Sequence, residues 1–282
     1  MYTTRVRETI LVYMSGALGD VILTSPALAL VREWRPGACI HWITPASAHE
    51  LYPTLHDGWT DINAASVAEL FSEGAAASIA RHGLWREARE AVVFESAESV
   101  LVRQLAGVLA VRAVDARPCA CGGEHYSKWV WQRTVEALGQ ASEFRVPVPA
   151  LRVPYEAPER PYAIVHPGSG SAKKCAPAEL IWRVCEDAAR GQRWRWVMLE
   201  GESDGEACAA LQACWRGRVT RLRVANLREL GWYLAHAAYY VGHDSGVSHL
   251  AGVVGARGTV LFGPTDPTVW RPLGEHLKVY RF

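Results

Sequence analysis

Two stretches of the chain combine small residues, hydroxyls and positive charge in the way that phosphate binding requires. The first follows an apolar run and contains Gly168, Ser169, Gly170, Lys173 and Lys174. Backbone N–H groups in such a loop, together with lysine ammonium groups, would hold a diphosphate. A flexible turn with solvated lysines is the alternative interpretation.

The second stretch opens a helix near the C-terminus. Asp244, Ser245 and Gly246 follow a short buried strand expected over residues 239–242, and His249 lies one turn inside the helix. The unpaired N–H groups at a helix start and the helix dipole attract anions. Asp and Ser are also ordinary N-cap residues, and a lone helical histidine is often a core residue, so both interpretations stay open.

The elements that must position these residues alternate between strand and helix. Strands are expected over residues 10–14, 39–44, 91–95, 111–115, 162–166, 196–199, 219–224, 239–242 and 259–262. Helices of the first half are expected over residues 21–34, 46–55, 66–90, 97–110 and 124–138. Continuous apolar strands that alternate with helices predict right-handed parallel crossovers and doubly wound sheets.

A proline-rich segment divides this α/β pattern into two parts. Prolines crowd residues 144–160, which show no apolar periodicity and are assigned to an interdomain linker. A chain of 282 residues with 50% apolar content can fill two cores. We therefore predict two α/β domains, residues 1–150 and 151–282.

Composition and local patterns exclude several classes of function. A formal net charge of +1 offers no field for nucleic acid, so no nucleic-acid partner is expected. The turn at residues 15–20 lacks both the G-x-G-x-x-G dinucleotide pattern and the Gly-Lys-Ser/Thr of a P-loop. A nicotinamide enzyme and a P-loop NTPase are therefore disfavoured.

The cysteines and the N-terminus predict a cytoplasmic location. Seven cysteines, an odd number, lie scattered as expected for reduced thiols, and Cys119 and Cys121 are interpreted as loop thiols rather than metal ligands. The apolar run at residues 10–14 is too short for a signal peptide or a membrane span.

Three motifs in matching order resemble glycosyltransferase family 9, the ADP-heptose lipopolysaccharide heptosyltransferases. They are G-A-L-G-D-V-I-L-T-S-P-A-L at 16–28, H-P-G-S-G-S-x-K-K at 166–174, and D-S-G-V-S-H at 244–249 with L-F-G-P-T-D-P at 261–267. The resemblance covers most of the chain. It implies the GT-B fold, in which two Rossmann-like domains face each other across a cleft, with the acceptor on the N-terminal side and the nucleotide-sugar in the C-terminal domain.

The resemblance also assigns the donor site. By it Ser169, Gly170 and Lys173 or Lys174 would hold the diphosphate, and Ser245 and Gly246 would add backbone N–H groups. Asp244 would contact the donor sugar, and His249 would reach the diphosphate or the sugar. Glu202 is expected on the ribose, with Glu200 as the competing assignment.

Asp20 is the catalytic residue that the resemblance implies. A carboxylate at this turn would accept the proton of the acceptor hydroxyl during an inverting attack. The competing interpretation is an N-cap for the helix expected from Val21. Lysines and helix dipoles would neutralise the leaving group, so no metal and no cofactor are expected.

The sequence predicts an inverting, metal-independent glycosyltransferase that moves a sugar, such as heptose from ADP-heptose, onto a glycan or glycolipid acceptor such as lipopolysaccharide core. Peripheral contact with the inner face of the membrane is part of this expectation. The alternatives are a non-catalytic nucleotide-sugar-binding protein and a GT-B-like sugar-nucleotide epimerase.

The chain departs from the family pattern in three places. Ala176-Pro177 stands where Trp-Pro is usual, and Tyr13-Met14 stands where many members carry Arg. The chain stops at Phe282, which predicts altered interdomain closure and favours the non-catalytic alternative, whereas the retained Asp20 favours the enzyme.

Overall fold

The computed structural model describes residues 7–45, 48–117, 122–156, 159, 161–216 and 219–282. They form two compact units. The first joins the residues up to Ala17 with Thr24–Pro147, and the second joins Leu18–Leu23 with Val148–Phe282. Cys119 and Cys121, interpreted above as loop thiols, lie outside the described residues.

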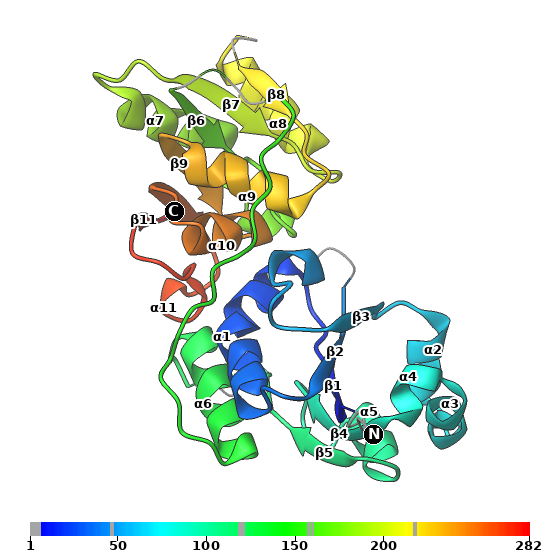
Figure 1. Cartoon of the computed structure of the whole chain (residues 1–282). Helices are drawn as coiled ribbons and strands as arrows, with labels where there is room; N and C mark the ends of the chain where they lie inside the picture. Colours follow the sequence, from blue (N-terminus) through cyan, green and yellow to red (C-terminus); the bar gives the residue numbers. More distant parts are fainter. Residues whose placement is uncertain (1–6, 46–47, 118–121, 157–158, 160, 217–218) are drawn as a thin grey trace. The chain divides into compact units, whose positions relative to one another are not determined.

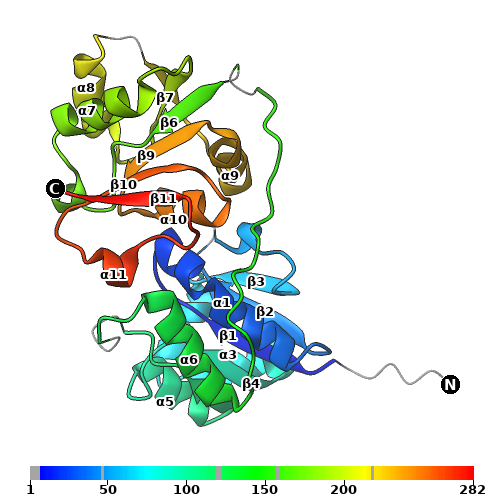
Figure 2. The same ribbon diagram turned by 90° about the vertical axis from the view of Figure 1, so that its left-hand side faces the viewer.

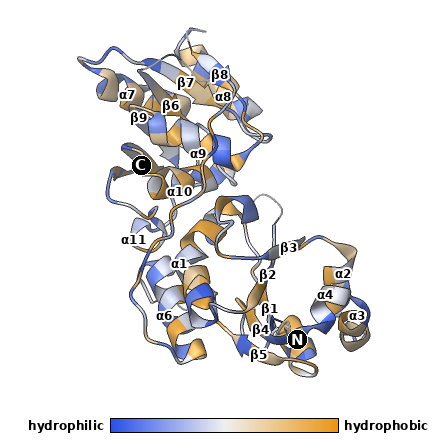
Figure 3. Ribbon diagram, in the orientation of Figure 1, coloured by the Kyte–Doolittle hydropathy of each residue, from blue (hydrophilic) through white to orange (hydrophobic). Residues whose placement is uncertain are grey.

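The first unit is built on a five-stranded parallel sheet with the order β3-β2-β1-β4-β5 (Figure 1). Its strands are β1 (Thr9–Tyr13), β2 (Cys39–Thr44), β3 (Gly58–Asp61), β4 (Ala88–Val93) and β5 (Ala110–Ala113). All five residues of β1 are buried, and Leu11 pairs with His41 on one side and Ala91 on the other. A continuous apolar run suits this central position because helices cover both faces of the sheet (Figure 3).

The helices of the first unit lie on both sides of its sheet. One side carries α6 (Tyr126–Leu138) and α1 (Leu18–Trp34), of which the part from Thr24 onward belongs to this unit (Figures 1 and 2). The other side carries α2 (Ala65–Ala68), η2 (Glu69–Phe71), α3 (Ala75–Arg81), α4 (Gly83–Arg86) and α5 (Val100–Ala106). Leu11, Tyr13 and Val93 from the sheet meet Trp85 and Leu101 from these helices in one apolar core.

Three local expectations for the first unit are wrong. The long helix expected over residues 66–90 is divided into short pieces, because the backbone is extended at Ser72 and His82 and β4 begins at Ala88. Of the helix expected over residues 46–55, the described part holds only the short turn η1 (His49–Leu51). The half-buried strand β3 was not predicted, because its four residues carry no apolar run.

The second unit is built on a six-stranded parallel sheet with the order β11-β10-β9-β6-β7-β8 (Figure 2). Its strands are β6 (Tyr162–Val165), β7 (Arg195–Leu199), β8 (Thr220–Leu222), β9 (Tyr239–His243), β10 (Gly258–Phe262) and β11 (Leu277–Arg281). The edge strand β11 was not predicted, because its side chains are mostly exposed and leave no buried apolar pattern.

Helices cover both faces of the second sheet as well. Residues of α7 (Ala178–Ala189) and α8 (Gly205–Cys214) pack with Val165, Met198 and Val241 on one face. On the other face, Tyr162 bonds to α9 (Leu227–His236) and Tyr240 bonds to α10 (Gly246–Val253). The short elements η4 (Ala172–Lys174) and α11 (Pro267–Trp270) follow β6 and β10.

The predicted α/β class with doubly wound parallel sheets is confirmed. In the second sheet the chain runs from β6 outward to β7 and β8, then returns and runs from β9 outward to β10 and β11. The strand order therefore reverses between β6 and β9, and ligands of open α/β sheets bind at the carboxyl ends of the strands at such a point. Among the described residues, none of the helices combines the length and the apolar composition of a membrane span.

Candidate functional site

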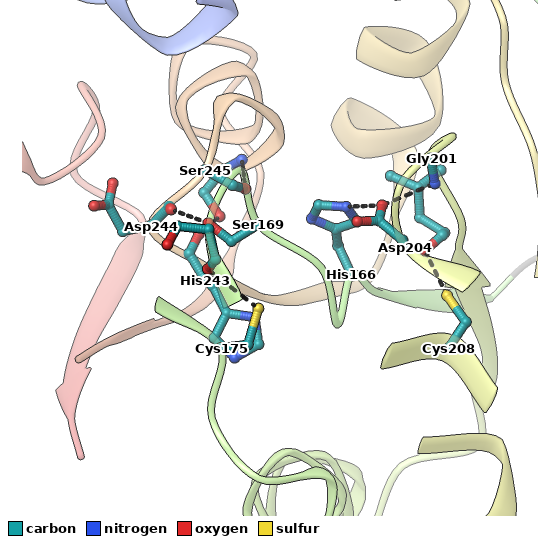
Figure 4. Close-up of polar contacts among 12 residues, drawn as sticks. His166, Ser169, Cys175, Gly201, Asp204, Cys208, His243, Asp244 and Ser245 are labelled. Atoms are coloured by element: carbon teal, nitrogen blue, oxygen red, sulfur yellow. Dashed lines mark hydrogen bonds and ion pairs between the residues drawn. The ribbon is translucent and has the colours of Figure 1, made fainter. Parts of the chain in front are cut away.

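The two predicted phosphate-binding stretches meet at the carboxyl ends of β6 and β9. The β6 loop (residues 166–174) contacts Asp244 twice. The Ser169 hydroxyl donates a 2.8 Å hydrogen bond to the backbone oxygen of Asp244 (Figure 4), and Lys174 Nζ lies 2.8 Å from Asp244 Oδ2. The structure therefore brings Ser169, Lys174 and Asp244 together, 70 or more residues apart in sequence.

Asp244 is the centre of this site, and its carboxylate is almost completely enclosed. Thr265 Oγ1 donates to Oδ2 at 2.8 Å, His249 Nε2 lies 3.6 Å from Oδ1, and the side chain is 5% exposed. Burial alone would raise the pKa of Asp244. Polar contacts with His249, Lys174 and Thr265 outweigh this effect and lower the pKa to about 2. We call Ser169, Lys174, Asp244, His249 and Thr265 the Asp244 cluster.

The predicted helix start is also present beside Asp244. Ser245 is the N-cap of α10, and its hydroxyl accepts a bond from Ser248 N–H. Gly246 is the first helical residue, and backbone bonding within the helix begins with His249 N–H, which donates to Ser245 O. The N-cap interpretation of Ser245 is thus confirmed, and it leaves the anion-attracting helix start in place.

The two lysines and the two candidate glutamates of the donor site differ in their surroundings. Lys173 is exposed, whereas Lys174 pairs with Asp244. Glu202 is exposed on the turn after β7, whereas Glu200 is buried and lies 3.3 Å from Arg221 and 2.9 Å from Arg223.

The bond from Arg223 holds the pKa of Glu200 below its usual value. Glu200 therefore has the fixed, ionised carboxylate, although the ribose assignment remains a prediction. Gly170 is exposed, and a Cβ added there would meet no atom within 4 Å. Its predicted diphosphate contact also remains a prediction.

A set of buried polar residues beneath the β6 loop was missed at the sequence level. The N–H of Ala176 donates to His243 Nε2 at 2.8 Å, and burial, with a further effect of His166, lowers the pKa of His243 to about 4. An accepting Nε2 requires the neutral imidazole, which the low pKa provides. Beside it, His166 Nε2 lies 2.9 Å from Asp204 Oδ2 (Figure 4).

The signals for these missed residues were weak. His166 and Thr265 stand inside the quoted motifs, and His243 directly precedes the motif that starts at Asp244, but none had a stated role. Asp204 was noticeable only as a carboxylate two residues after Glu202.

Asp20 lies in the first turn of α1 and is half-buried. The helix begins at Leu18 rather than at Val21, so the competing interpretation of Asp20 as the N-cap is wrong. The reason is that Leu18 and Gly19 adopt helical conformation and move the helix start toward the N-terminus. Asp20 follows β1, where the order of the first sheet reverses between β1 and β4.

Described residues of the second unit line at least two cavities. One of about 320 Å³ lies beside the β6 loop and is lined by Pro167, Gly168, Asp204 and side chains of α7 and α8. A larger one of about 580 Å³, lined by Tyr162, Trp194 and Thr220 among others, lies at the amino ends of β6, β7 and β8. Volume alone therefore does not locate the site.

Within the described ranges, no three His, Cys, Asp or Glu side chains are grouped to hold a metal ion.

Known proteins resemble the chain in sequence and in fold. Lipopolysaccharide heptosyltransferase 3 of Escherichia coli is 30% identical over 120 residues, which span 41% of this chain and 35% of that enzyme. A family 9 glycosyltransferase from Veillonella parvula matches with a TM-score of 0.73 at 18% identity, covering 98% of this chain and 86% of that one.

The E. coli heptosyltransferase WaaC, solved with ADP, matches with a TM-score of 0.68 at 18% identity, covering 97% and 93% of the two chains. These structural similarities show that the predicted GT-B fold is shared. The profile of glycosyltransferase family 9 (heptosyltransferase) matches residues 125–282, which include the β6 loop, Asp244 and the start of α10. Because that match covers more than half of the chain, the protein belongs to glycosyltransferase family 9.

Proposed function

We propose that the protein is a glycosyltransferase that uses a nucleotide-activated sugar. The donor is ADP-heptose and the acceptor is a glycan or glycolipid of the lipopolysaccharide core type. The observation that carries this proposal is the gathering of Lys174, Ser169 and the start of α10 around Asp244 at the switch point of the second sheet. A lysine, a hydroxyl and the N–H groups at a helix start are the kinds of donor that bind a diphosphate.

The second unit supplies the donor half of the reaction. Asp244 and the diphosphate would share the charge of Lys174, whose side chain is one-third exposed and so remains accessible. The first-turn N–H groups of α10 would bond to phosphate oxygens and stabilise the negative charge that develops on the leaving group. No further cofactor takes part, because the nucleotide-sugar is a substrate.

Asp20 is the general base of this proposal. The acceptor oxygen attacks the anomeric carbon, the bond from that carbon to the diphosphate oxygen breaks, and the hydroxyl proton passes to the Asp20 carboxylate. Configuration is inverted because attack and departure occur on opposite faces of the sugar. Asp20 takes the proton as the new bond forms, because the attacking oxygen becomes acidic at that stage.

The reaction needs no divalent metal in this proposal, because Lys174 and the start of α10 neutralise the leaving diphosphate. The protein acts in the cytoplasm, and contact with the inner face of the membrane is the means by which it meets a glycolipid acceptor.

The first test measures donor binding by calorimetry with ADP, UDP, GDP and ADP-heptose. ADP and ADP-heptose should bind more tightly than the other two nucleotides, and failure of every nucleotide to bind would refute the donor site.

The second test replaces Asp20 by Asn, which has nearly the same shape but cannot take the proton. Release of ADP during transfer should fall at least about 100-fold, while the affinity for ADP-heptose and the melting temperature stay near the parent values. Transfer at the parent rate would place the base elsewhere.

ADP-heptose that binds the parent protein but is never turned over would indicate a binding protein, and donor consumed without acceptor would indicate an epimerase.

A further inference from the structure

A buried histidine–aspartate pair joins two loops beside the candidate donor site. His166 follows β6 and is 4% exposed, and Asp204 ends the loop after β7 and is 8% exposed. Their side chains meet at 2.9 Å, between His166 Nε2 and Asp204 Oδ2 (Figure 4). The pair connects the loops of two neighbouring strands at the carboxyl end of the sheet.

The Asp204 carboxylate also contacts the backbone of both loops. Its Oδ2 accepts a 2.9 Å bond from Gly201 N–H in its own loop. In the β6 loop it packs directly on Gly168, where an added Cβ would lie 1.7 Å from Oδ1. Only a glycine lets the carboxylate lie this close to the backbone of the β6 loop.

The backbone of His166 is attached independently of its side chain. Its N–H donates to Val241 O at 2.8 Å, which continues the pairing of β6 with β9. The start of the β6 loop is therefore held from one side by β9 and from the other side by Asp204. The bond from His166 lowers the pKa of Asp204, so the carboxylate is ionised at neutral pH.

The His166–Asp204 pair and the Asp244 cluster are connected through a short segment of the β6 loop. Ser169, which bonds to Asp244, is the next residue after Gly168. Lys174, which pairs with Asp244, ends the same loop. A shift of Gly168 would move Ser169 directly, whereas the core beneath the loop would keep its own packing.

We propose that Asp204, acting with His166, is a positioning residue that holds the β6 loop in the conformation in which Ser169 and Lys174 bind the donor diphosphate. This inference rests on the proposed function. It assigns Asp204 no contact with the substrate.

The test measures the dissociation constant for ADP by calorimetry and the stability by urea unfolding in matched variants. Asp204→Ala removes the pair, and Asp204→Asn keeps an oxygen that can accept from His166 and Gly201. Leu211→Ala is the control for stability, because Leu211 is a buried core residue of α8, the helix that follows Asp204, and has no role in the pair. Ser203→Ala is the control for a neighbouring exposed side chain.

The Asp204→Ala variant should bind ADP about 10- to 100-fold more weakly, the range for loss of one charge-assisted bond. Asp204→Asn should recover affinity to within roughly threefold of the parent, because the accepting oxygen is kept. Leu211→Ala should keep the parent affinity even though its stability falls at least as far. The Ser203→Ala variant should match the parent in both measurements.

A folded Asp204→Ala variant with parent affinity would overturn the proposal. So would an equal loss of affinity in Leu211→Ala, since this would show a general effect of stability. If Asp204→Ala does not fold, Gly168→Ala decides, because its methyl group displaces the carboxylate from the loop. Weakened ADP binding in that variant supports the proposal, and unchanged binding overturns it. A parent protein that binds no nucleoside diphosphate would refute the proposed function itself.

Discussion

Replacing Lys174 by Ala tests the centre of the site, and the chain provides its own control in Lys173. Lys174 Nζ lies 2.8 Å from Asp244 Oδ2, with 33% of the lysine side chain and 5% of the aspartate side chain exposed. Lys173 is exposed and is the neighbouring residue. The two substitutions remove the same charge from the same loop, but only one removes the partner of a buried carboxylate.

The expected loss of stability follows from what remains around Asp244. Removing one partner of a fully buried ion pair costs about 3–5 kcal/mol. Solvent reaches Lys174, and Thr265 and His249 still contact the carboxylate, so the loss for Lys174→Ala should be smaller, about 1–2 kcal/mol. That corresponds to a decrease of roughly 3–6 °C in the melting temperature. Lys173→Ala should change the free energy of unfolding by less than about 0.5 kcal/mol.

The stability difference between Lys174→Ala and the parent should also depend on pH. The pKa of Asp244 is about 2 in the folded protein and 3.8 in the reference state, so its ionised form stabilises the fold above about pH 4. This contribution is lost as the pH falls from about 4 to 2, where the carboxylate becomes protonated. The stability difference between Lys174→Ala and the parent should therefore shrink over the same range.

Urea unfolding of the parent and both variants, at pH 7 and at intervals down to pH 2.5, measures these differences. Calorimetry with ADP should show about tenfold weaker binding for Lys174→Ala and near-parent binding for Lys173→Ala. Equal stability of both variants and the parent at pH 7 would refute the reasoning from the Asp244 pair. Equal losses in both variants would show that net charge, rather than this contact, is responsible.

Three further predictions concern the metal, the ribose and buried histidine. Transfer measured after EDTA treatment should keep the parent rate, and loss with recovery on adding magnesium would contradict metal independence. Glu200→Gln should weaken ADP binding in calorimetry, because the fixed carboxylate beside Arg223 is the better ribose ligand. Glu202→Gln should leave ADP binding unchanged. Weaker binding in Glu202→Gln alone would assign the ribose contact to Glu202. Burial lowers the pKa of His243 from 6.5 to about 4, so protonation opposes folding, and urea titrations should show stability falling as the pH decreases from 6.5 to 4. His243→Gln should flatten that slope, by roughly 1 kcal/mol per pH unit, and an unchanged slope would exclude His243 as its source.

The sequence alone determined the class of the fold and predicted where an anion could bind. Continuous apolar runs such as residues 10–14 and 239–242 predicted buried parallel strands, because a strand covered on both faces can be apolar throughout. The glycine-rich loop at 166–174 and the helix start after Asp244 also predicted an anion site, because backbone donors depend on local conformation.

Predictions of helices and strands from local sequence patterns failed where contacts with residues far away in the sequence stabilise the segment. The helix expected over residues 66–90 has alanine-rich composition, yet it is broken at Ser72 and His82 so that the short helices can cover the sheet. The strand β11 lies at an edge, where one hydrogen-bonded neighbour holds it without apolar alternation. Propensity is a weak predictor where tertiary packing provides most of the stability.

Only the tertiary structure decided which members of similar pairs lie inside the fold. Lys174 rather than Lys173 meets Asp244, and Glu200 rather than Glu202 is buried, because the loop conformation points one neighbour inward. His166 and Asp204 are 38 residues apart and meet because β6 and β7 are adjacent in the sheet. Strand adjacency follows from the packing of the whole second unit, so residue types and spacing could predict each loop but not the contacts between them.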